Sequence, residues 1–244
     1  MRENKYDDEA FFFKYGQMER SLHGLSGAGE WYALKPLLPD FKDRRVLDLG
    51  CGYGWHCAYA IEQGAKKVVG VDISERMLAV AQGKTASPNI KYLCAPMEDI
   101  SFAPNSFDAV ISSLAFHYVA DFGGLCRRIY AWLAPGGAFV FSVEHPVFTA
   151  EGSQQWTDDA SGRHLHWPVD RYYEEGRREA EFLGERVIKY HRTLHSYVNA
   201  LFNCSFSLTG LIEPQPQGEY ETLSPEMRDE FRRPMMLLLA AKKA

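Results

Sequence analysis

Residues 46–56 read VLDLGCGYGWH, a short apolar strand that runs into glycines at every second position, Gly50, Gly52 and Gly54. Glycine occurs where the backbone must turn tightly or let a ligand approach, because it has no Cβ atom. In α/β sheets, ligands bind beyond the carboxyl ends of the strands, where such loops lead into helices. The loop therefore predicts an α/β fold with a ligand lying against its backbone.

Apolar strand-like runs alternate with helical stretches along most of the chain. We expect strands over residues 46–49, 68–71, 90–94, 109–112, 138–143, 208–213 and 235–241. We expect helices over residues 55–63, after an N-cap at Ser74, across Leu125 to Trp132, and over 194–202. This alternation predicts a largely parallel sheet with helices on both faces. The loops after the first five strands should then carry the function.

Two segments lie outside this alternation. Residues 1–40 read as an N-terminal helical cap, with a helix over 20–38 packed near the ligand edge of the sheet. Residues 148–190 are rich in tryptophan and tyrosine among polar residues, and they show no clear periodicity. A connection this long inside a compact domain is usually a lid or a binding insertion. We expect one domain over residues 1–244, with residues 148–190 as its lid.

Composition excludes several classes of protein. The net charge is -5 and the basic residues are not gathered in one stripe, so the sequence lacks the footprint of a nucleic-acid binder. The five cysteines are scattered without a C-x-x-C pair, which indicates free thiols in a reducing compartment rather than a zinc site or disulfide framework. The sequence shows no signal peptide and no run of membrane-spanning length. We expect a cytoplasmic protein with no membrane partner.

Two interpretations compete for the glycine loop. A nicotinamide-binding loop needs G-x-G-x-x-G, but the third glycine position holds Trp55 or Cys57, depending on where the motif starts. Asp72 follows the second strand, and its carboxylate can accept hydrogen bonds from both hydroxyls of a ribose. Nicotinamide enzymes place an acid similarly, so Asp72 does not separate the two interpretations. The glycine spacing does, and it disfavours an NAD-dependent oxidoreductase.

Three stretches carry a resemblance to a known family. VLDLGCGYG, SFAPNSFDAVISSLAFHYVAD and LAPGGAFVFSVEHP resemble the class I S-adenosylmethionine-dependent methyltransferases, in particular the group of small-molecule and ubiquinone-biosynthesis methyltransferases. The resemblance covers residues 40–145. It implies a Rossmann-like, seven-stranded, mostly parallel sheet in the order 3-2-1-4-5-7-6 with the last strand antiparallel. It also implies S-adenosyl-L-methionine as cofactor, S-adenosyl-L-homocysteine as product and a small-molecule methyl acceptor.

The resemblance also implies which residues hold the cofactor. Members of the family commonly carry an acid after the third strand that binds adenine, but Pro96 stands there and has no side-chain acceptor. Adenine would then rely on a neighbouring glutamate and on sandwiching between two apolar side chains. The N-terminal segment offers a tyrosine and an arginine for the cofactor carboxylate. The cofactor-binding residues expected on this basis are Tyr15, Arg20, Asp48, Gly50, Gly52, Gly54, Asp72, Ile73, Met97, Glu98 and Ser113.

The acceptor side is predicted from the loops after strands four and five and from the insertion. Histidine is the usual base near neutral pH, so His117 and His145 are the candidate catalytic bases. Flat aromatic and polar side chains suit a small organic acceptor. The substrate-binding candidates are Tyr118, Glu144, Trp167, Tyr172, His191 and Arg192. No metal site is expected, because His164 and His166 have no acid or cysteine nearby at ligand spacing.

Other functions stay open at this point. One alternative is a cofactor-binding regulatory protein without catalysis. A protein or RNA methyltransferase is another, although SSLAF stands where an N/D-P-P-Y/F motif would follow strand four. The expected partner is a small-molecule acceptor and not a nucleic acid. The sequence leaves open a homodimer.

Overall fold

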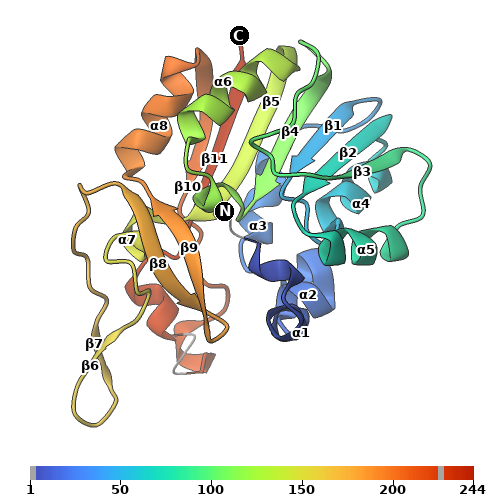
Figure 1. The fold of residues 1–244 in the computed structure, drawn as a ribbon. Coiled ribbons are helices and arrows are strands. Elements are labelled where there is room, and N and C mark those ends of the chain that lie inside the picture. Colours follow the sequence, from blue (N-terminus) through green and yellow to red (C-terminus); the bar gives the residue numbers. More distant parts are fainter. Residues whose placement is uncertain (1–3, 225–227) are drawn as a thin grey trace.

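The computed structural model describes residues 4–224 and 228–244, and a seven-stranded sheet runs through it (Figure 1). Its strand order is β3-β2-β1-β4-β5-β11-β10. Neighbours from β3 to β5 are parallel, whereas β11 is antiparallel to both β5 and β10. The strands are β1 (Arg45–Leu49), β2 (Lys67–Asp72), β3 (Ile90–Cys94), β4 (Phe107–Ser113), β5 (Leu133–Glu144), β10 (Phe206–Ile212) and β11 (Met236–Lys243). The predicted order and the antiparallel last strand are confirmed.

Helices cover both faces of the sheet (Figure 1). Among them are the four helices that were predicted, α4 (Trp55–Glu62), α5 (Glu75–Lys84), α6 (Phe122–Trp132) and α8 (Leu194–Asn203). The predicted N-cap Ser74 accepts a hydrogen bond from the Met77 N–H, which satisfies one of the free donors at the start of α5. These helices are confirmed close to the predicted bounds, and strand β5 begins five residues earlier than expected.

The two faces of the sheet bury separate cores. Along β11, Leu237 and Leu239 face the core under α6 and α8, while Leu238 and Ala240 face the core under α4 and α5. Successive side chains of a strand point to opposite faces, so a strand covered on both sides is apolar throughout. This explains the near-continuous apolar runs from which the strands were predicted.

The predicted helix over residues 20–38 is wrong, because the segment is broken. It consists of α2 (Glu19–His23), a 3-10 turn (Gly24–Gly27), α3 (Trp31–Leu34) and another 3-10 turn (Lys35–Leu37). A Cβ on Gly27 would lie 2.2 Å from the carbonyl oxygen of Glu19. The chain therefore folds back tightly at a residue without a side chain and cannot continue as one helix.

The insertion is more regular than the sequence indicated. After α7 (Pro146–Thr149) it forms a short hairpin of β6 (Thr157–Asp158) and β7 (His164–His166), then a longer hairpin of β8 (Gly176–Phe182) and β9 (Glu185–His191). The longer hairpin turns on Leu183 and Gly184, which both have positive φ angles. Two-residue turns of this kind match the twist of the flanking strands.

The N-terminal segment packs against this longer hairpin. Helix α1 (Glu9–Gly16) buries Phe11 completely against Ala180 and Val187 of the hairpin. Lys14 Nζ donates a hydrogen bond of 2.9 Å to the Leu183 carbonyl at the turn. The N-terminal segment and the insertion thus meet beyond the carboxyl ends of the central strands (Figure 1).

We predict that Gly54→Ala destabilises the protein more than Gly136→Ala. Both glycines have φ near +75°, so each alanine pays a similar backbone strain of about 1–2 kcal/mol. A Cβ at Gly54 would also lie 2.5 Å from Tyr92 Oη, whereas a Cβ at Gly136 would meet nothing within 4 Å. Overpacking should add about 1–3 kcal/mol to the loss at Gly54, measured by denaturant unfolding. Equal losses in the two variants would contradict this packing.

Candidate functional site

A cavity of about 380 Å³ lies at the carboxyl ends of β1, β2 and β4. The N-terminal segment and the insertion both contribute residues to its wall, and the cavity is partly open to solvent. The structure brings most of the predicted site residues to this cavity. Those that line it are Tyr15, Arg20, Gly50, Gly52, Asp72, Ile73, Met97, Glu98, Ser113, His117, Tyr118 and Glu144.

The glycine loop forms part of the cavity floor. The N–H groups of Gly50 and Cys51 both donate to the Val71 carbonyl, which holds the loop against the end of β2. Gly50 has a φ of +73°, and a Cβ there would lie 2.3 Å from the Cβ of Ala115. Gly52 has a φ of +51°, and a Cβ there would meet nothing within 4 Å. Gly50 is therefore needed for packing, while Gly52 leaves open a place where a ligand can approach the backbone.

Asp72 joins the glycine loop to the start of α5. Its carboxylate accepts hydrogen bonds of 2.8 Å from the Gly52 N–H and 2.9 Å from the Ser74 N–H. Burial raises the pKa of Asp72, against the lowering effect of these two hydrogen bonds. Each carboxylate oxygen has a second lone pair. Asp72 can therefore still accept hydrogen bonds from two hydroxyls of a ligand in the cavity.

Two residues predicted to bind the cofactor do not line the cavity. Asp48 is buried beneath the loop, where Oδ2 accepts from Cys57 Sγ at 3.3 Å and Oδ1 has no partner in the described part of the chain. Burial raises the pKa of Asp48 to about 7. Gly54 begins α4 and packs against Tyr92. The structure therefore gives both residues a place behind the cavity wall.

The N-terminal segment places one cation at the cavity. Arg20 forms an ion pair of 2.5 Å with Glu30, whose side chain is fully buried. The same Glu30 oxygen accepts a hydrogen bond of 3.0 Å from Ser113 Oγ on β4. Glu30 was missed by the sequence analysis, because a glutamate between Gly29 and Trp31 carries no local signal of burial. It holds Arg20 at the edge of the cavity, where the guanidinium can meet an anionic group.

The third strand ends at an apolar part of the cavity. Ile73 and Met97 both line it, as the sandwich prediction requires, and Glu98 lies next to them. Pro96 also lines the cavity, at the position where an acid was missing from the sequence pattern. The Pro96 carbonyl accepts a hydrogen bond of 2.9 Å from the Asp99 N–H, so its backbone is used to shape the turn.

Comparisons with known proteins decide the family. A family model described as a methyltransferase domain matches residues 47–141. A crystal structure from Listeria monocytogenes, described as an S-adenosylmethionine dependent methyltransferase, is 54% identical, covers 91% of this chain and 99% of its own, and has a TM-score of 0.86. An S-adenosylmethionine dependent methyltransferase from Mesorhizobium loti is 43% identical, covers 90% of this chain and 100% of its own, and has a TM-score of 0.82. This chain belongs to the S-adenosylmethionine-dependent methyltransferases.

The curated relatives leave the acceptor of this methyltransferase open. An uncharacterized protein of Haemophilus influenzae is 32% identical over 98% of this chain and 96% of its own length. A malonyl-[acyl-carrier protein] O-methyltransferase of Enterobacter lignolyticus is 34% identical, but the match covers 51% of this chain and 48% of that protein. The match to this named relative is therefore limited to about half of each chain. The cofactor is S-adenosylmethionine, which the open backbone at Gly52 and the free lone pairs of Asp72 fit.

His117, a candidate catalytic base, lines the cavity in the turn after β4. Its side chain is buried, and its Nδ1 accepts a hydrogen bond of 3.4 Å from the Glu144 N–H. Burial lowers the pKa of His117 to about 4, so the ring is neutral at pH 7. A neutral ring that accepts at Nδ1 carries its hydrogen on Nε2. His117 therefore offers a hydrogen-bond donor at neutral pH rather than a base.

The other candidate base, His145, does not line the cavity. Its Nε2 pairs with Glu213 at 2.8 Å, and its Nδ1 accepts from the Val147 N–H at 3.0 Å as the N-cap of α7. Both ring nitrogens are engaged away from the cavity. This geometry therefore gives no support to the prediction of His145 as a catalytic base. That prediction was based on the position of His145 after strand five, which does not indicate that the ring caps a helix.

Four predicted substrate-binding residues hold the insertion together instead of lining the cavity. Trp167 Nε1 donates to the Val147 carbonyl at 3.1 Å, and the ring stacks on Phe148, which does line the cavity. The hydroxyl of Tyr172 accepts from the Leu194 N–H at 3.2 Å. Trp167 therefore supports a residue of the cavity wall, and Tyr172 ties the insertion to the start of α8.

The remaining two, His191 and Arg192, are buried where the insertion rejoins the sheet. His191 is bonded at both ring nitrogens, to Thr149 Oγ1 at 2.8 Å and to the Tyr172 carbonyl at 2.9 Å. Arg192 donates to the carbonyls of Val119 and Ala120. The guanidinium thus satisfies backbone acceptors, and neither residue is placed to touch a substrate.

The sequence analysis also missed residues that complete the cavity. Tyr6 is one of them: it lines the cavity, and its hydroxyl oxygen lies 3.2 Å from that of Tyr118, which was predicted. Gln154 lines the cavity beside Glu144, and Phe182 enters from the β8–β9 hairpin. These contacts join residues far apart in the chain, and no local pattern indicates them.

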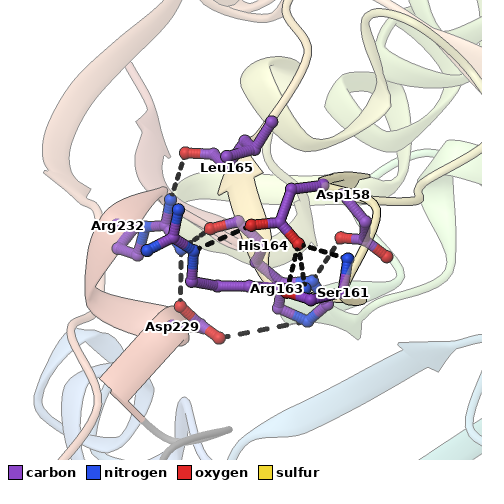
Figure 2. Close-up of polar contacts among 8 residues, drawn as sticks. Asp158, Ser161, Arg163, His164, Leu165, Asp229 and Arg232 are labelled. Atoms are coloured by element: carbon purple, nitrogen blue, oxygen red, sulfur yellow. Dashed lines mark hydrogen bonds and ion pairs between the residues drawn. The ribbon is translucent and has the colours of Figure 1, made fainter.

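The short hairpin β6–β7 is fixed by polar contacts outside the cavity (Figure 2). His164 Nδ1 pairs with Asp158 at 2.6 Å, and Arg232 donates to the carbonyls of His164 and Leu165. Figure 2 shows these side chains with Asp229, which pairs with Arg232. Over residues 4–224 and 228–244, no three histidine, cysteine, aspartate or glutamate side chains are grouped to hold a metal, and no helix is long and apolar enough to cross a membrane.

We predict that His117 weakens the protein as the pH falls. The pKa of His117 is about 4 in the folded protein and near 6.5 when unfolded, so the unfolded chain binds more protons between these values. Stability contributed by the neutral ring is present above pH 6.5 and is lost as the pH falls toward 4. His117→Gln should remove roughly 3 kcal/mol of this pH dependence.

Urea unfolding of both proteins from pH 7 to pH 4.5 measures the difference. His195→Gln, which replaces an exposed histidine on α8, is the matched control. Identical pH dependence in wild type and His117→Gln would show that the ring is not buried in its neutral form.

Proposed function

We propose that this enzyme transfers the methyl group of S-adenosylmethionine to a small organic acceptor enclosed between the N-terminal cap and the insertion. The observation that carries the proposal is that the cap and the insertion both contribute aromatic side chains to the wall of the cavity. The hydroxyl oxygens of Tyr6 in the cap and Tyr118 after β4 lie 3.2 Å apart, and Phe148 and Phe182 of the insertion line the same cavity. A volume of about 380 Å³ is typical of small-molecule sites.

The residues at the carboxyl ends of β1 to β3 would hold the cofactor. Asp72 would accept from the ribose hydroxyls, and Gly52 would let the nucleoside lie against the backbone. Arg20 would meet the carboxylate of the methionine part, held in place by Glu30. Ile73 and Met97 would pack on adenine, with Glu98 and Tyr15 beside the cofactor. When bound, the cofactor supplies a methyl group on a positively charged, electrophilic sulfur.

The protein's main contribution would be alignment. Holding an acceptor at reacting distance from the methyl group can lower the barrier by as much as ~7–11 kcal/mol. The aromatic side chains of Tyr6, Tyr118 and Phe182 would limit the access of water to the bound substrates. His117 would hold part of the acceptor through Nε2–H, rather than remove a proton from it.

Relatives with other acceptors define the competing possibilities. Their names include a tRNA U34 carboxymethyltransferase and a protein arginine N-methyltransferase. A net charge of -5 without a basic stripe disfavours RNA, since nucleic-acid binding relies on positive charge. A protein acceptor would have to extend a side chain past the N-terminal cap and the insertion, whose residues line the cavity. The cytoplasmic location and a homodimer remain predictions of the sequence.

We predict that Asp72→Asn weakens binding of S-adenosylhomocysteine by more than about tenfold. Hydrogen bonds to a charged group contribute about 1.5–3 kcal/mol, and the amide replaces one acceptor oxygen with a donor. Glu75→Gln, on the exposed first turn of α5, is the control and should bind as wild type does. Calorimetric titration of both variants with S-adenosylhomocysteine, and of wild type with NAD, makes the measurement.

The outcome separates the functions that the sequence left open. Release of S-adenosylhomocysteine with small organic acceptors, but not with tRNA, is expected of the wild type. Cofactor binding without turnover on any acceptor would favour a regulatory protein. Unchanged affinity in Asp72→Asn would contradict the proposed cofactor site.

A further inference from the structure

The acceptor wall contains a buried, hydrogen-bonded group of three side chains. Lys189 Nζ donates to Glu144 Oε1 at 2.6 Å and to Gln154 Oε1 at 2.8 Å. Gln154 Nε2 donates to Glu144 Oε2 at 2.7 Å. Glu144 and Gln154 line the cavity, and the Lys189 side chain behind them is 2% exposed. We call Glu144, Gln154 and Lys189 the carboxylate triad.

The backbone at Gln154 is strained to complete this triad. Its φ is +60°, a left-handed value that costs a residue with a side chain about 1–2 kcal/mol. Strained backbone that persists in a folded protein is concentrated at functional sites. The strain brings the Gln154 amide to both charged partners, so the surrounding contacts must outweigh its cost.

The triad presents a hydrogen-bond acceptor to the cavity. Each Glu144 oxygen uses one lone pair on its triad partner and retains a second. Burial acts to raise the pKa of Glu144, but the pKa is lowered on balance; at pH 7, where His117 is neutral, the charge of Lys189 and the hydrogen bonds from Lys189 and Gln154 favour the ionised carboxylate. The carboxylate is thus ionised and is a weak base. It can accept a hydrogen bond from an N–H group of a bound molecule, and Lys189 balances its charge.

The charges around the cavity disfavour an anionic acceptor. Of the described lysine and arginine side chains, Arg20 alone lines the cavity, and it is paired with Glu30. The acidic residues that line it are Asp72, Glu98, Glu144 and Glu181. A carboxylate or phosphate on the acceptor would therefore enter a negative environment without a free cation to receive it.

The hydrogen-bond directions also disfavour acceptors that must first lose a proton. His117 accepts from the Glu144 N–H at Nδ1, so it offers a donor. The Glu144 carboxylate is held by Lys189 and Gln154 and is a weak base. An alcohol or a C–H acid must transfer its proton to a base as it attacks a methyl group. An uncharged amine needs none, because its lone pair is already available.

We propose that the acceptor is an uncharged, weakly basic aromatic or heteroaromatic amine, whose N–H group is accepted by Glu144. This inference rests on the proposed function. The rings of Tyr6, Tyr118, Phe148 and Phe182 fit the flat body of such a molecule. In the transfer, the nitrogen lone pair forms the new N–C bond. The S–C bond breaks with its electrons left on sulfur, and the proton of the methylated nitrogen leaves to water.

Three matched probes test the inference on the wild-type enzyme loaded with S-adenosylhomocysteine. They are 3-aminoquinoline, 3-hydroxyquinoline and quinoline-3-carboxylate, which differ only in the group that Glu144 would receive. Calorimetry should show the amine binding at least tenfold more tightly than the carboxylate, while the hydroxyl compound, which can also donate to Glu144, should bind as well. With S-adenosylmethionine, the amine should be methylated on its nitrogen and the hydroxyl compound should not react; methylation of its oxygen would overturn the inference.

A variant tests the role of the triad. Glu144→Gln should reduce the preference for amine over carboxylate to less than threefold, while Glu179→Gln on the exposed face of the β8–β9 hairpin should keep it. If Glu144→Gln does not fold, the three probes on the wild type still decide the question.

Failure of the inference differs from failure of the proposed function. If S-adenosylhomocysteine itself does not bind, the proposed function fails. If it binds, but the amine does not bind or the carboxylate binds as tightly as the amine, the amine inference is overturned. The proposal of an enclosed small-molecule acceptor then stands alone.

Discussion

The site depends on the Asp72 carboxylate, which links two successive βα units. One oxygen accepts from Gly52 in the loop after β1, and the other accepts from Ser74 at the start of α5. These two N–H groups lie outside the strands, and the Asp72 carboxylate supplies their hydrogen-bond acceptor. The same carboxylate therefore holds the glycine loop in its open conformation and keeps lone pairs for a ribose. Cofactor binding and local folding use one side chain.

The N-terminal cap is attached to the protein next to Asp72. Ser74 Oγ donates to Asp7 at 2.6 Å, and the Arg76 N–H donates to the same oxygen at 3.1 Å. The N-terminal cap is thus tied to the beginning of α5, next to Asp72. From there α1 reaches the β8–β9 hairpin through Phe11. The space proposed for the acceptor is therefore bordered by elements that are tied to the start of α5, beside Asp72.

The features that could be predicted are those with local signals. The strands buried on both faces were found from their apolar runs, and the loop at Gly50 and Gly52 from glycine spacing. Asp72 was found because it ends a strand in a repeated βα pattern. The departure at Pro96 was also visible, because proline cannot supply the missing side chain. These features depend on neighbouring residues, so one stretch of sequence is enough.

The features that were missed depend on distant partners. Glu30 is buried only because Arg20 and Ser113 meet it. The β8–β9 hairpin shows no clear periodicity in the sequence, because charged residues interrupt its buried apolar face. Its turn is formed by Leu183 and Gly184. His145, His191 and Arg192 have chemistry that suits a site, but each is already engaged by a partner elsewhere in the chain. Residue type and approximate position could not reveal these partners.

A crystal structure of the enzyme with S-adenosylhomocysteine tests the central claim most directly. The account predicts ribose hydroxyls within hydrogen-bonding distance of both Asp72 oxygens, with the nucleoside in contact with the Gly52 backbone. A nucleoside bound elsewhere, with the Asp72 carboxylate held by backbone donors alone, would contradict it.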